Sequence, residues 1–249
     1  MNMLIQERGD RMAAFLEDIN PFYGTRQKNE QNQDLEKFLE VYDPKMYENS
    51  CVTTDVLVIQ HKTDFKSVET GLKLLMIKRK NHPCIGYWAL PGGFVEVKED
   101  LEAAAKRELE EETHLTGISL EQLATWGEYK RDPRARIITV SYLALVEDNL
   151  NVEAGDDAAE AIWMDILLKK GDIEQFIEDK KKKVKTKYKL ELINEEEGIH
   201  LSSEVYEIKN QEGLLREKNY QIGLSEQIAC DHARIILHAL LFIEHLLLQ

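Results

Sequence analysis

The 249-residue chain has 46 acidic and 32 basic residues, which gives a formal net charge of −14 and a pI near 5.0. This charge argues against general affinity for nucleic acids, which are bound through clustered Lys and Arg. No apolar run is long enough to span a bilayer. Residues 7–11 carry several charges, and no apolar region of signal-peptide length follows them, so we expect no signal peptide and a cytoplasmic location.

The cysteines point to the same compartment. Cys51, Cys84 and Cys230 are odd in number, isolated in the sequence and without Cys-x-x-Cys spacing. Such residues are typical of reduced thiols in a cytosolic protein. The length fits one large domain, or one domain with appendages.

In chain order, residues 1–50 are expected to form a polar N-terminal extension, with a short amphipathic helix from Asp34 to Val41 that Pro44 ends. Residues 51–168 have the pattern of a catalytic domain with strands around one helix, for which Asp100 is the expected N-cap. The expected strands cover 52–60, 73–79, two short stretches within 86–97, 122–129, 136–146 and 159–166. This order predicts an α/β fold with a mixed sheet and helices on its faces.

Residues 169–249 are expected to add a β-hairpin and a long helix. The hairpin strands cover 187–194 and 201–210, and the helix covers 226–248. Because the helix has a broad apolar face, we expect it to pack on the sheet of the catalytic domain, with a dimer contact as the alternative.

The helix that follows Asp100 has an unusual distribution of charge. Counting about 100° per residue, Glu108, Glu111 and Glu112 point in nearly the same direction as the apolar residues. Like charges one turn apart repel, and partly buried carboxylates lose hydration. They could take up protons, pair with Arg or Lys, or share a hard divalent cation such as Mg²⁺. A salt-bridged surface helix is the ordinary alternative.

The spacing around this helix resembles the signature of the Nudix hydrolases, also called the MutT family, G-x5-E-x7-R-E-U-x-E-E-x-G-U, where U is aliphatic. The matching residues here are Gly93, Glu99, Arg107, Glu108, Leu109, Glu111, Glu112 and Leu115, preceded by Leu90-Pro91-Gly92-Gly93. One position departs, because His114 stands where the family has Gly. Either His114 adopts the left-handed conformation that ends the helix, or the helix continues to Gly117.

The resemblance implies a Nudix-type α/β/α sandwich and hydrolysis of a nucleoside diphosphate linked to another group. It also implies that Glu108, Glu111 and Glu112 bind Mg²⁺, with Mn²⁺ as a substitute, and that water activated by the ion attacks phosphorus. Arg107 is expected to orient a glutamate, and Glu99 to fix the loop or position water. A homodimer is expected from the same resemblance.

A turn rich in arginine lies between two expected strands. Arg131, Arg134 and Arg136 could bind phosphate oxygens together with Gly92 and Gly93, or belong to an ordinary charged hairpin. The turn resembles one in the branch around the ADP-ribose pyrophosphatases and related regulators. We therefore expect a substrate such as ADP-ribose or a related dinucleotide or nucleotide sugar.

Several other residues have open roles. The general base could be Asp156, Asp157, Glu160 or a glutamate of the motif, and Glu153 lies in the same acidic stretch. Tyr87 and Trp88 could stack on a base, but core packing is favoured. The single histidines, including His61, His82 and His232, are expected to be structural. The lysine-rich residues 180–189 could contact an anionic partner, although a solvated face is favoured.

Two rival functions remain. One is the pyrophosphohydrolysis of nucleoside triphosphates, as in the sanitising branch of the family. The other is a non-catalytic regulator that senses ADP-ribose and binds DNA. The regulator is disfavoured because its glutamates would have no catalytic use, and because we expect no room for a winged helix after the last helix near Gln249.

Overall fold

The computed structural model describes residues 15–46, 48–62, 65–147, 158–212 and 217–248. The chain divides into two compact units, Met1–Asn49 and Ser50–Gln249. The first unit contains the short helices η1 (Asn20–Phe22), α1 (Leu35–Val41) and η2 (Pro44–Met46). The side chain of Asp34 accepts a hydrogen bond from the amide of Lys37 and so caps α1. The helix predicted from Asp34 to Val41 is confirmed.

The second unit is built on one ten-stranded sheet in the order β10-β9-β8-β7-β2-β1-β6-β5, with β3 paired to β2 and β4 to β1. The pairing of β1 with β6 is parallel, and the other pairings among the described strands are antiparallel. The strands are β1 (Cys51–His61), β2 (Leu72–Arg79), β3 (Trp88–Ala89), β4 (Gly92–Phe94), β5 (Glu121–Trp126), β6 (Ile137–Glu147), β7 (Ala158–Glu178), β8 (Lys181–Asn194), β9 (Ile199–Asn210) and β10 (Lys218–Glu226).

Two helices cover opposite faces of this sheet. Because side chains alternate along a strand, Val56 and Val58 of β1 face the helix α2 (Leu101–Thr113). Leu57 and Ile59 of the same strand belong to the core formed with α3 (His232–Leu247). The predicted mixed α/β fold, with helices on both faces of the sheet, is therefore confirmed.

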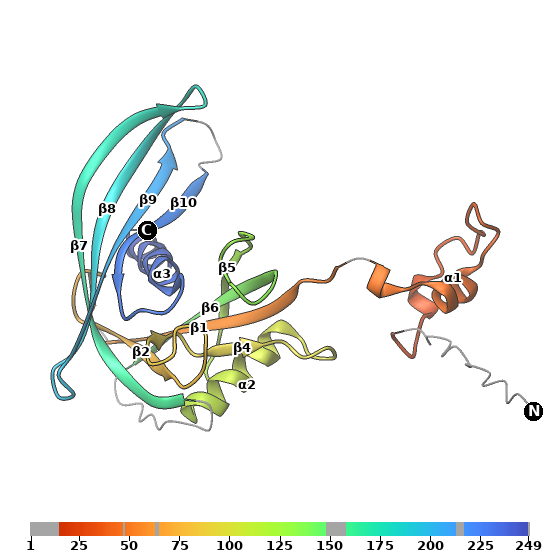
Figure 1. The fold of residues 1–249 in the computed structure, drawn as a ribbon, viewed down its shortest axis with the longest axis horizontal. Helices are drawn as coiled ribbons and strands as arrows, with labels where there is room; N and C mark the ends of the chain where they lie inside the picture. Colours follow the sequence, from red (N-terminus) through yellow and green to blue (C-terminus); the bar gives the residue numbers. More distant parts are fainter. Residues whose placement is uncertain (1–14, 47, 63–64, 148–157, 213–216, 249) are drawn as a thin grey trace, which may run out of the picture. The chain divides into compact units, whose positions relative to one another are not determined.

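The C-terminal strands extend the sheet well beyond the expected hairpin. The hairpin of β8 and β9 is present, but β7 continues to Glu178, and β10 adds a further strand. Figure 1 shows β7 to β10 as a curved sheet with α3 on its concave side. Residue 168, where we placed a domain boundary, lies within β7. A single strand thus runs across the division placed between residues 168 and 169, and the division itself stays a prediction.

The final helix is shorter than expected, because it begins at His232 and not near residue 226. Gln227 and Cys230 have φ angles of 59° and 47°, which interrupt a right-handed helix. The segment before the helix instead pairs with β3, where Ile228 bridges Trp88. Ile235, Ile236 and Leu240 are fully buried, so α3 packs on the sheet. Within the described residues, no helix has the length and apolar character needed to cross a membrane.

The lysine-rich stretch lies mainly on β8, and acidic side chains compensate its charge. Lys183 pairs with Glu178 at 2.6 Å and Lys189 with Glu191 at 2.9 Å, while Lys187 pairs with Glu204. Lys185 lies over the ring of Tyr206 at 4.2 Å from its centroid. Charge compensation of this kind, within β8 and across to its neighbours, favours the solvated face over an anionic partner.

Candidate active site

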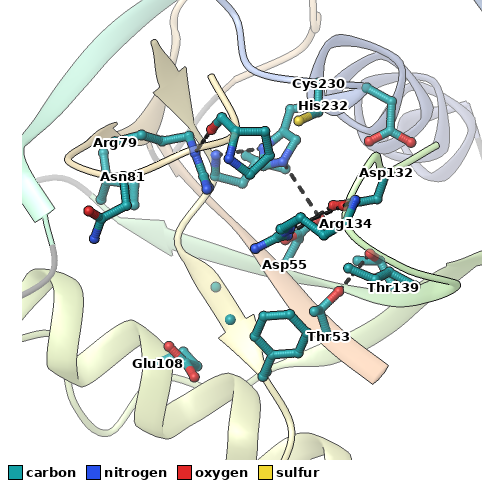
Figure 2. Close-up of a pocket in the computed structure, with 18 of the residues that line it drawn as sticks. Thr53, Asp55, Arg79, Asn81, Glu108, Asp132, Arg134, Thr139, Cys230 and His232 are labelled. Carbon is teal, nitrogen blue, oxygen red and sulfur yellow. Dashed lines mark hydrogen bonds and ion pairs between the residues drawn. The ribbon is translucent and has the colours of Figure 1, made fainter. Parts of the chain in front are cut away.

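A polar pocket of about 380 Å³ opens near the starts of β1 and β6, on the face of the sheet that α3 covers. Its walls come from parts of the chain that are far apart in sequence. They are Thr53 and Asp55 of β1, the end of β2 and the residues after it, the β4 glycines, Glu108 and Glu112 of α2, residues 131–134 of the loop before β6, Ile137 and Thr139 of β6, and Cys230–His232. Figure 2 shows Glu108 on one side of this pocket and Asp55, Arg134 and His232 on another.

Two glycines let α2 approach the pocket. A Cβ atom at Gly92 would lie 2.0 Å from the carbonyl oxygen of Thr54, and one at Gly93 would lie 2.4 Å from Oε2 of Glu108. Both positions are therefore closed to larger residues unless a neighbour moves. The glutamates of α2 consequently lie against the bare backbone of β4. Both glycines line the pocket, and their expected role in binding substrate stays a prediction.

Glu112 is a buried carboxyl group, with 7% of its surface exposed. The amide of Gly92 donates a hydrogen bond of 2.8 Å to its Oε2. Burial raises the pKa of Glu112 to about 8, and the nearby Glu108 adds to this effect. Burial likewise raises the pKa of Glu108, against the opposing influence of Arg107. The pocket therefore holds two carboxyl groups whose charged forms are not stabilised by hydration as they would be in water.

Arg107 connects the motif's acidic residues. Its Nε and Nη2 atoms donate to the two oxygens of Glu99 at 2.8 and 2.9 Å, and Nη2 also donates to the carbonyl oxygen of Phe94 at 3.0 Å. Its Nη1 atom donates to Glu108 at 2.8 Å and to Glu111 at 3.0 Å. These hydrogen bonds fix the loop between β4 and α2 and orient Glu108, which is the geometry expected for Arg107 and Glu99.

Glu111 does not face the protein as expected. Its side chain is 54% exposed, and it is absent from the pocket lining. On the helical wheel it lies about 160° from the buried Leu109 but only about 20° from the buried Ala104, and so at the edge of the packed face. Only Glu108 and Glu112 reach the pocket from α2. The carboxylates of Glu108 and Glu111 nevertheless approach the same nitrogen of Arg107.

The departure from the motif at His114 is accommodated by the backbone. His114 takes a left-handed conformation with φ 58° and ψ 15°, and its amide donates to the carbonyl oxygen of Glu110 at 2.8 Å. The helix thus ends at this residue and does not continue to Gly117. The position keeps the conformation for which Gly is favoured, so the carboxylates stay in register.

The arginine loop is divided in its roles. Arg131 forks onto Asp231 with two hydrogen bonds of 2.9 Å, and Arg134 forks onto Asp132 at 2.9 and 3.1 Å. Both arginines line the pocket, whereas Arg136 is exposed and outside its lining. Arg134 also lies over the ring of Phe94, 5.2 Å from the centroid. The internal aspartates reduce the charge that these two arginines can offer to a phosphate.

Asp55 and His232 form a buried pair that the sequence did not indicate. The amide of Leu90 donates to Nδ1 of His232 at 2.9 Å, so the proton of a neutral ring lies on Nε2, 4.0 Å from Asp55 Oδ2. Burial raises the pKa of Asp55, while His232 and Arg131 oppose the rise. A charged residue within the apolar run 52–60 was the available signal for Asp55. The expectation that His232 is only structural does not account for its position in the pocket.

Arg79 is a second feature of the pocket that the sequence did not indicate. Its Nε atom donates to the carbonyl oxygen of Pro83 at 2.8 Å, which anchors the loop after β2. Figure 2 shows its side chain directed into the pocket. Burial raises the pKa of Glu112 and of Asp55, and the positive charge of Arg79 opposes both changes. Arg79 thus adds a cation beside the acidic groups.

The donor set fits a hard divalent cation. Glu108 and Glu112 offer carboxylate oxygens in a pocket where burial disfavours their charge, and a bound cation removes that penalty. Among the described residues, no three His, Cys, Asp or Glu side chains form a complete ligand cluster. A cation held here would therefore complete its shell with water and substrate oxygens, as Mg²⁺ commonly does.

Other expectations have mixed outcomes. Trp88 is buried in the core, while Tyr87 is exposed. Glu160 pairs with Lys78 at 2.8 Å on β2 and does not line the pocket. Glu153, Asp156 and Asp157 lie outside the described residues. The identity of a general base in that stretch therefore stays a prediction.

Comparison with known proteins identifies the family. The NUDIX domain model matches residues 54–178, half of the chain. The chain is 42% identical over 112 residues to the ADPR responsive transcriptional repressor NtrR of Acinetobacter baylyi, covering 44% of this chain and 42% of the relative. It is 42% identical over 99 residues to the ADP-ribose pyrophosphatase of Methanocaldococcus jannaschii, covering 40% of this chain and 58% of that enzyme.

Among solved structures, a MutT/nudix family protein from Enterococcus faecalis superposes with a TM-score of 0.57 at 29% identity, covering 84% of this chain and 69% of that one. The two curated relatives are matched over less than two thirds of their own length. The matched residues 54–178 contain Gly92 and Gly93, α2 and most of the residues that line the pocket, although Thr53 and Cys230–His232 lie outside them. The chain belongs to the NUDIX domain family.

Proposed function

We propose that the protein is a divalent-metal-dependent hydrolase that cleaves the diphosphate bond of ADP-ribose or of a related dinucleotide or nucleotide sugar. The observation that carries the proposal is the placement of Glu108 and Glu112 against the backbone of Gly92 and Gly93, inside a pocket that also contains arginines. The similarity to an ADP-ribose pyrophosphatase supports this substrate class. The products would be AMP and ribose 5-phosphate.

The residues of this chain would divide the work as follows. Glu108 and Glu112 hold the cation. We keep Glu111 as a third ligand, because its carboxylate and that of Glu108 accept hydrogen bonds from the same nitrogen of Arg107 and so lie close together. When bound, the Mg²⁺ or Mn²⁺ ion supplies positive charge to the phosphate oxygens and activates water for attack. Arg107 keeps Glu108 in place, and Glu99 fixes Arg107. Asp55 is a further carboxyl group that could hold a proton in the pocket.

Arg79 is the cation that we assign to the substrate phosphates. Arg131 and Arg134 already have aspartate partners, whereas the described contact of Arg79 is to a neutral carbonyl oxygen through Nε. Guanidinium groups bind phosphate with paired hydrogen bonds. Arg134, which is part exposed, can assist from the opposite wall. Replacing Arg79 by Met should raise KM for ADP-ribose more than it lowers kcat.

The decisive experiment is to measure AMP release from ADP-ribose with Mg²⁺, comparing the wild type with Glu112→Gln and with Glu102→Gln. Glu102 lies on the outer face of the same helix, where it pairs with Lys106, so its variant is the matched control. Loss of release in Glu112→Gln alone would support the proposal. A wild type that leaves ADP-ribose and NADH intact would contradict it.

The rival functions predict different results in the same assay. Hydrolysis of nucleoside triphosphates, without release from ADP-ribose, would favour the sanitising reaction. Binding of ADP-ribose without hydrolysis would favour a regulator, a possibility supported by the similarity to the NtrR repressor. A homodimer and a cytoplasmic location remain proposals for this chain.

A further inference from the structure

Cys84 and Cys230 are far apart in sequence but adjacent in space. Their Sγ atoms are 3.5 Å apart, although 146 positions separate the residues. Cys84 lies in the loop between β2 and β3, and Cys230 lies just before α3. Cys51, the third cysteine, is exposed on β1. The three thiols therefore differ in their surroundings, and only one pair among them is in contact.

Both cysteines are held by the backbone around them. Their φ angles are 59° and 47°, in the left-handed region that residues with a Cβ atom seldom adopt. The amide of Tyr87 donates to the carbonyl oxygen of Cys84 at 3.1 Å, and that of Ala229, next to Cys230, donates to Trp88 at 2.8 Å. These contacts hold the two thiols side by side at the pocket, where Cys230 is part of the lining.

We propose that Cys84 and Cys230 form an oxidisable dithiol, which hydrogen peroxide converts to a disulfide beside the active-site pocket. A disulfide needs a sulfur–sulfur distance of about 2.05 Å, so the two atoms must approach by about 1.5 Å. Side-chain rotation and a small shift of either loop can provide that movement. No oxidant other than the peroxide is required.

The reaction proceeds in two balanced steps. The Cys84 thiolate attacks peroxide, forming an S–O bond as the O–O bond breaks, and the departing hydroxide takes up the thiol proton to give water. The sulfur of Cys230 then attacks that of Cys84, forming the S–S bond as the S–O bond breaks, and the departing hydroxide takes up the Cys230 thiol proton and leaves as a second water. Burial raises the pKa of Cys230 to about 12, and Cys84 adds to the rise, which assigns the first attack to Cys84.

The disulfide would act on groups that shape the pocket. Cys230 precedes Asp231, which holds Arg131, and His232, which accepts from the amide of Leu90. Cys84 follows Pro83, whose carbonyl oxygen anchors Arg79. Drawing the two segments together displaces these anchors. We expect oxidation to lower kcat/KM for ADP-ribose by on the order of tenfold, an effect that rests on the proposed function.

The test uses the full chain, reduced and then treated with hydrogen peroxide. Peptide mapping by mass spectrometry should find a cross-link between the peptides that contain Cys84 and Cys230, reversed by dithiothreitol. Cys51→Ser should retain this cross-link, and Cys84→Ser and Cys230→Ser should lose it. Equal melting temperatures of the reduced variants would show that they are folded, and mapping of the wild type does not depend on them.

The possible outcomes separate the two proposals. Cys84 and Cys230 that stay reduced, that oxidise separately to sulfinic acids, or that link to Cys51 would overturn the dithiol. A cross-link in a protein whose reduced form does not hydrolyse ADP-ribose would support the dithiol and contradict the proposed function. A cross-link that leaves kcat/KM of an active enzyme unchanged would overturn the proposed effect on the pocket.

Discussion

The amide of Gly92 donates a 2.8 Å hydrogen bond to the carboxyl group of Glu112, and this contact joins the start of β4 to α2. Glu112 lies on the packed face of α2, so its carboxyl group is buried at a place where a bound cation would stabilise it. The carboxyl group of Glu112 therefore destabilises the protein when no cation is bound and helps to bind the cation when one is present. Stability and activity should respond to its replacement in opposite ways.

Glu112→Gln should lower ADP-ribose hydrolysis by at least about 100-fold, because one cation ligand is lost. Without metal, the variant should be at least as stable as the wild type, since a neutral amide replaces an acidic group in a buried site. The measurement is thermal unfolding with EDTA and with added Mg²⁺. The wild type should gain stability from Mg²⁺ and the variant much less. An equal gain in both proteins would contradict the assignment of Glu112 as a ligand.

Gly93→Ala should lower activity strongly while changing stability little. The added Cβ atom would lie 2.4 Å from Oε2 of Glu108, so the end of that side chain must move. Because the obstacle is a flexible side chain, we expect a stability cost below about 1 kcal/mol but a loss of activity of roughly tenfold or more. Gly127→Ala is the matched control, since a Cβ atom there meets nothing within 4 Å. Equal activities of the two variants would refute the prediction.

Arg107→Lys should show whether the forked geometry or only the positive charge is needed. Lysine keeps the charge but cannot hold Glu99, Glu108 and the carbonyl oxygen of Phe94 at once. We expect activity to fall about 10- to 100-fold, in the range for residues that orient metal ligands. Lys106→Met on the outer face removes an exposed pair with Glu102 and should change little. Steady-state kinetics of both variants, with folding checked by circular dichroism, test this contrast.

The sequence allowed the prediction of features that are local. Short apolar runs located β1, β2 and β6, and the spacing of the motif located α2 after Gly92 and Gly93. Even the exception at His114 was foreseen as one of two alternatives, because a left-handed residue is a local requirement. Glu111 was misplaced because it lies at the edge of the packed face, where the wheel alone does not decide exposure.

Features that depend on tertiary structure were missed. The residues 169–172, Lys-Lys-Gly-Asp, have the composition of a turn, yet they continue β7 through an irregularity in its pairing with β8. Asp55 and His232, like Cys84 and Cys230, meet only because α3 returns across the sheet to the starts of the early strands. The residue pattern of one segment does not predict such contacts, because the partner residue lies in a distant segment of the chain.

Asp231→Asn tests another contact of this kind, between Arg131 and Asp231, through the pH dependence of the free energy of unfolding. Burial by itself raises the pKa of Asp231, but hydrogen bonds and charge from Arg131, with His232 and Arg234, lower it overall. A carboxyl group with a lowered folded-state pKa stabilises the fold above its unfolded pKa of about 3.9. That stabilisation is lost as the pH falls through the lower folded value.

The wild type should therefore lose stability on acidification below about pH 4, and Asp231→Asn should show a shallower loss over the same range. At neutral pH the variant should be about 3–5 kcal/mol less stable, because Arg131, whose side chain is 6% exposed, loses its charged partner. Asp165→Asn, which removes an exposed partner of Lys73 at 3.9 Å, is the control and should change stability by less than about 1 kcal/mol. Denaturant unfolding from pH 3 to pH 7 measures both effects, and parallel pH profiles for the wild type and Asp231→Asn would show that Arg131 does not depend on this carboxylate.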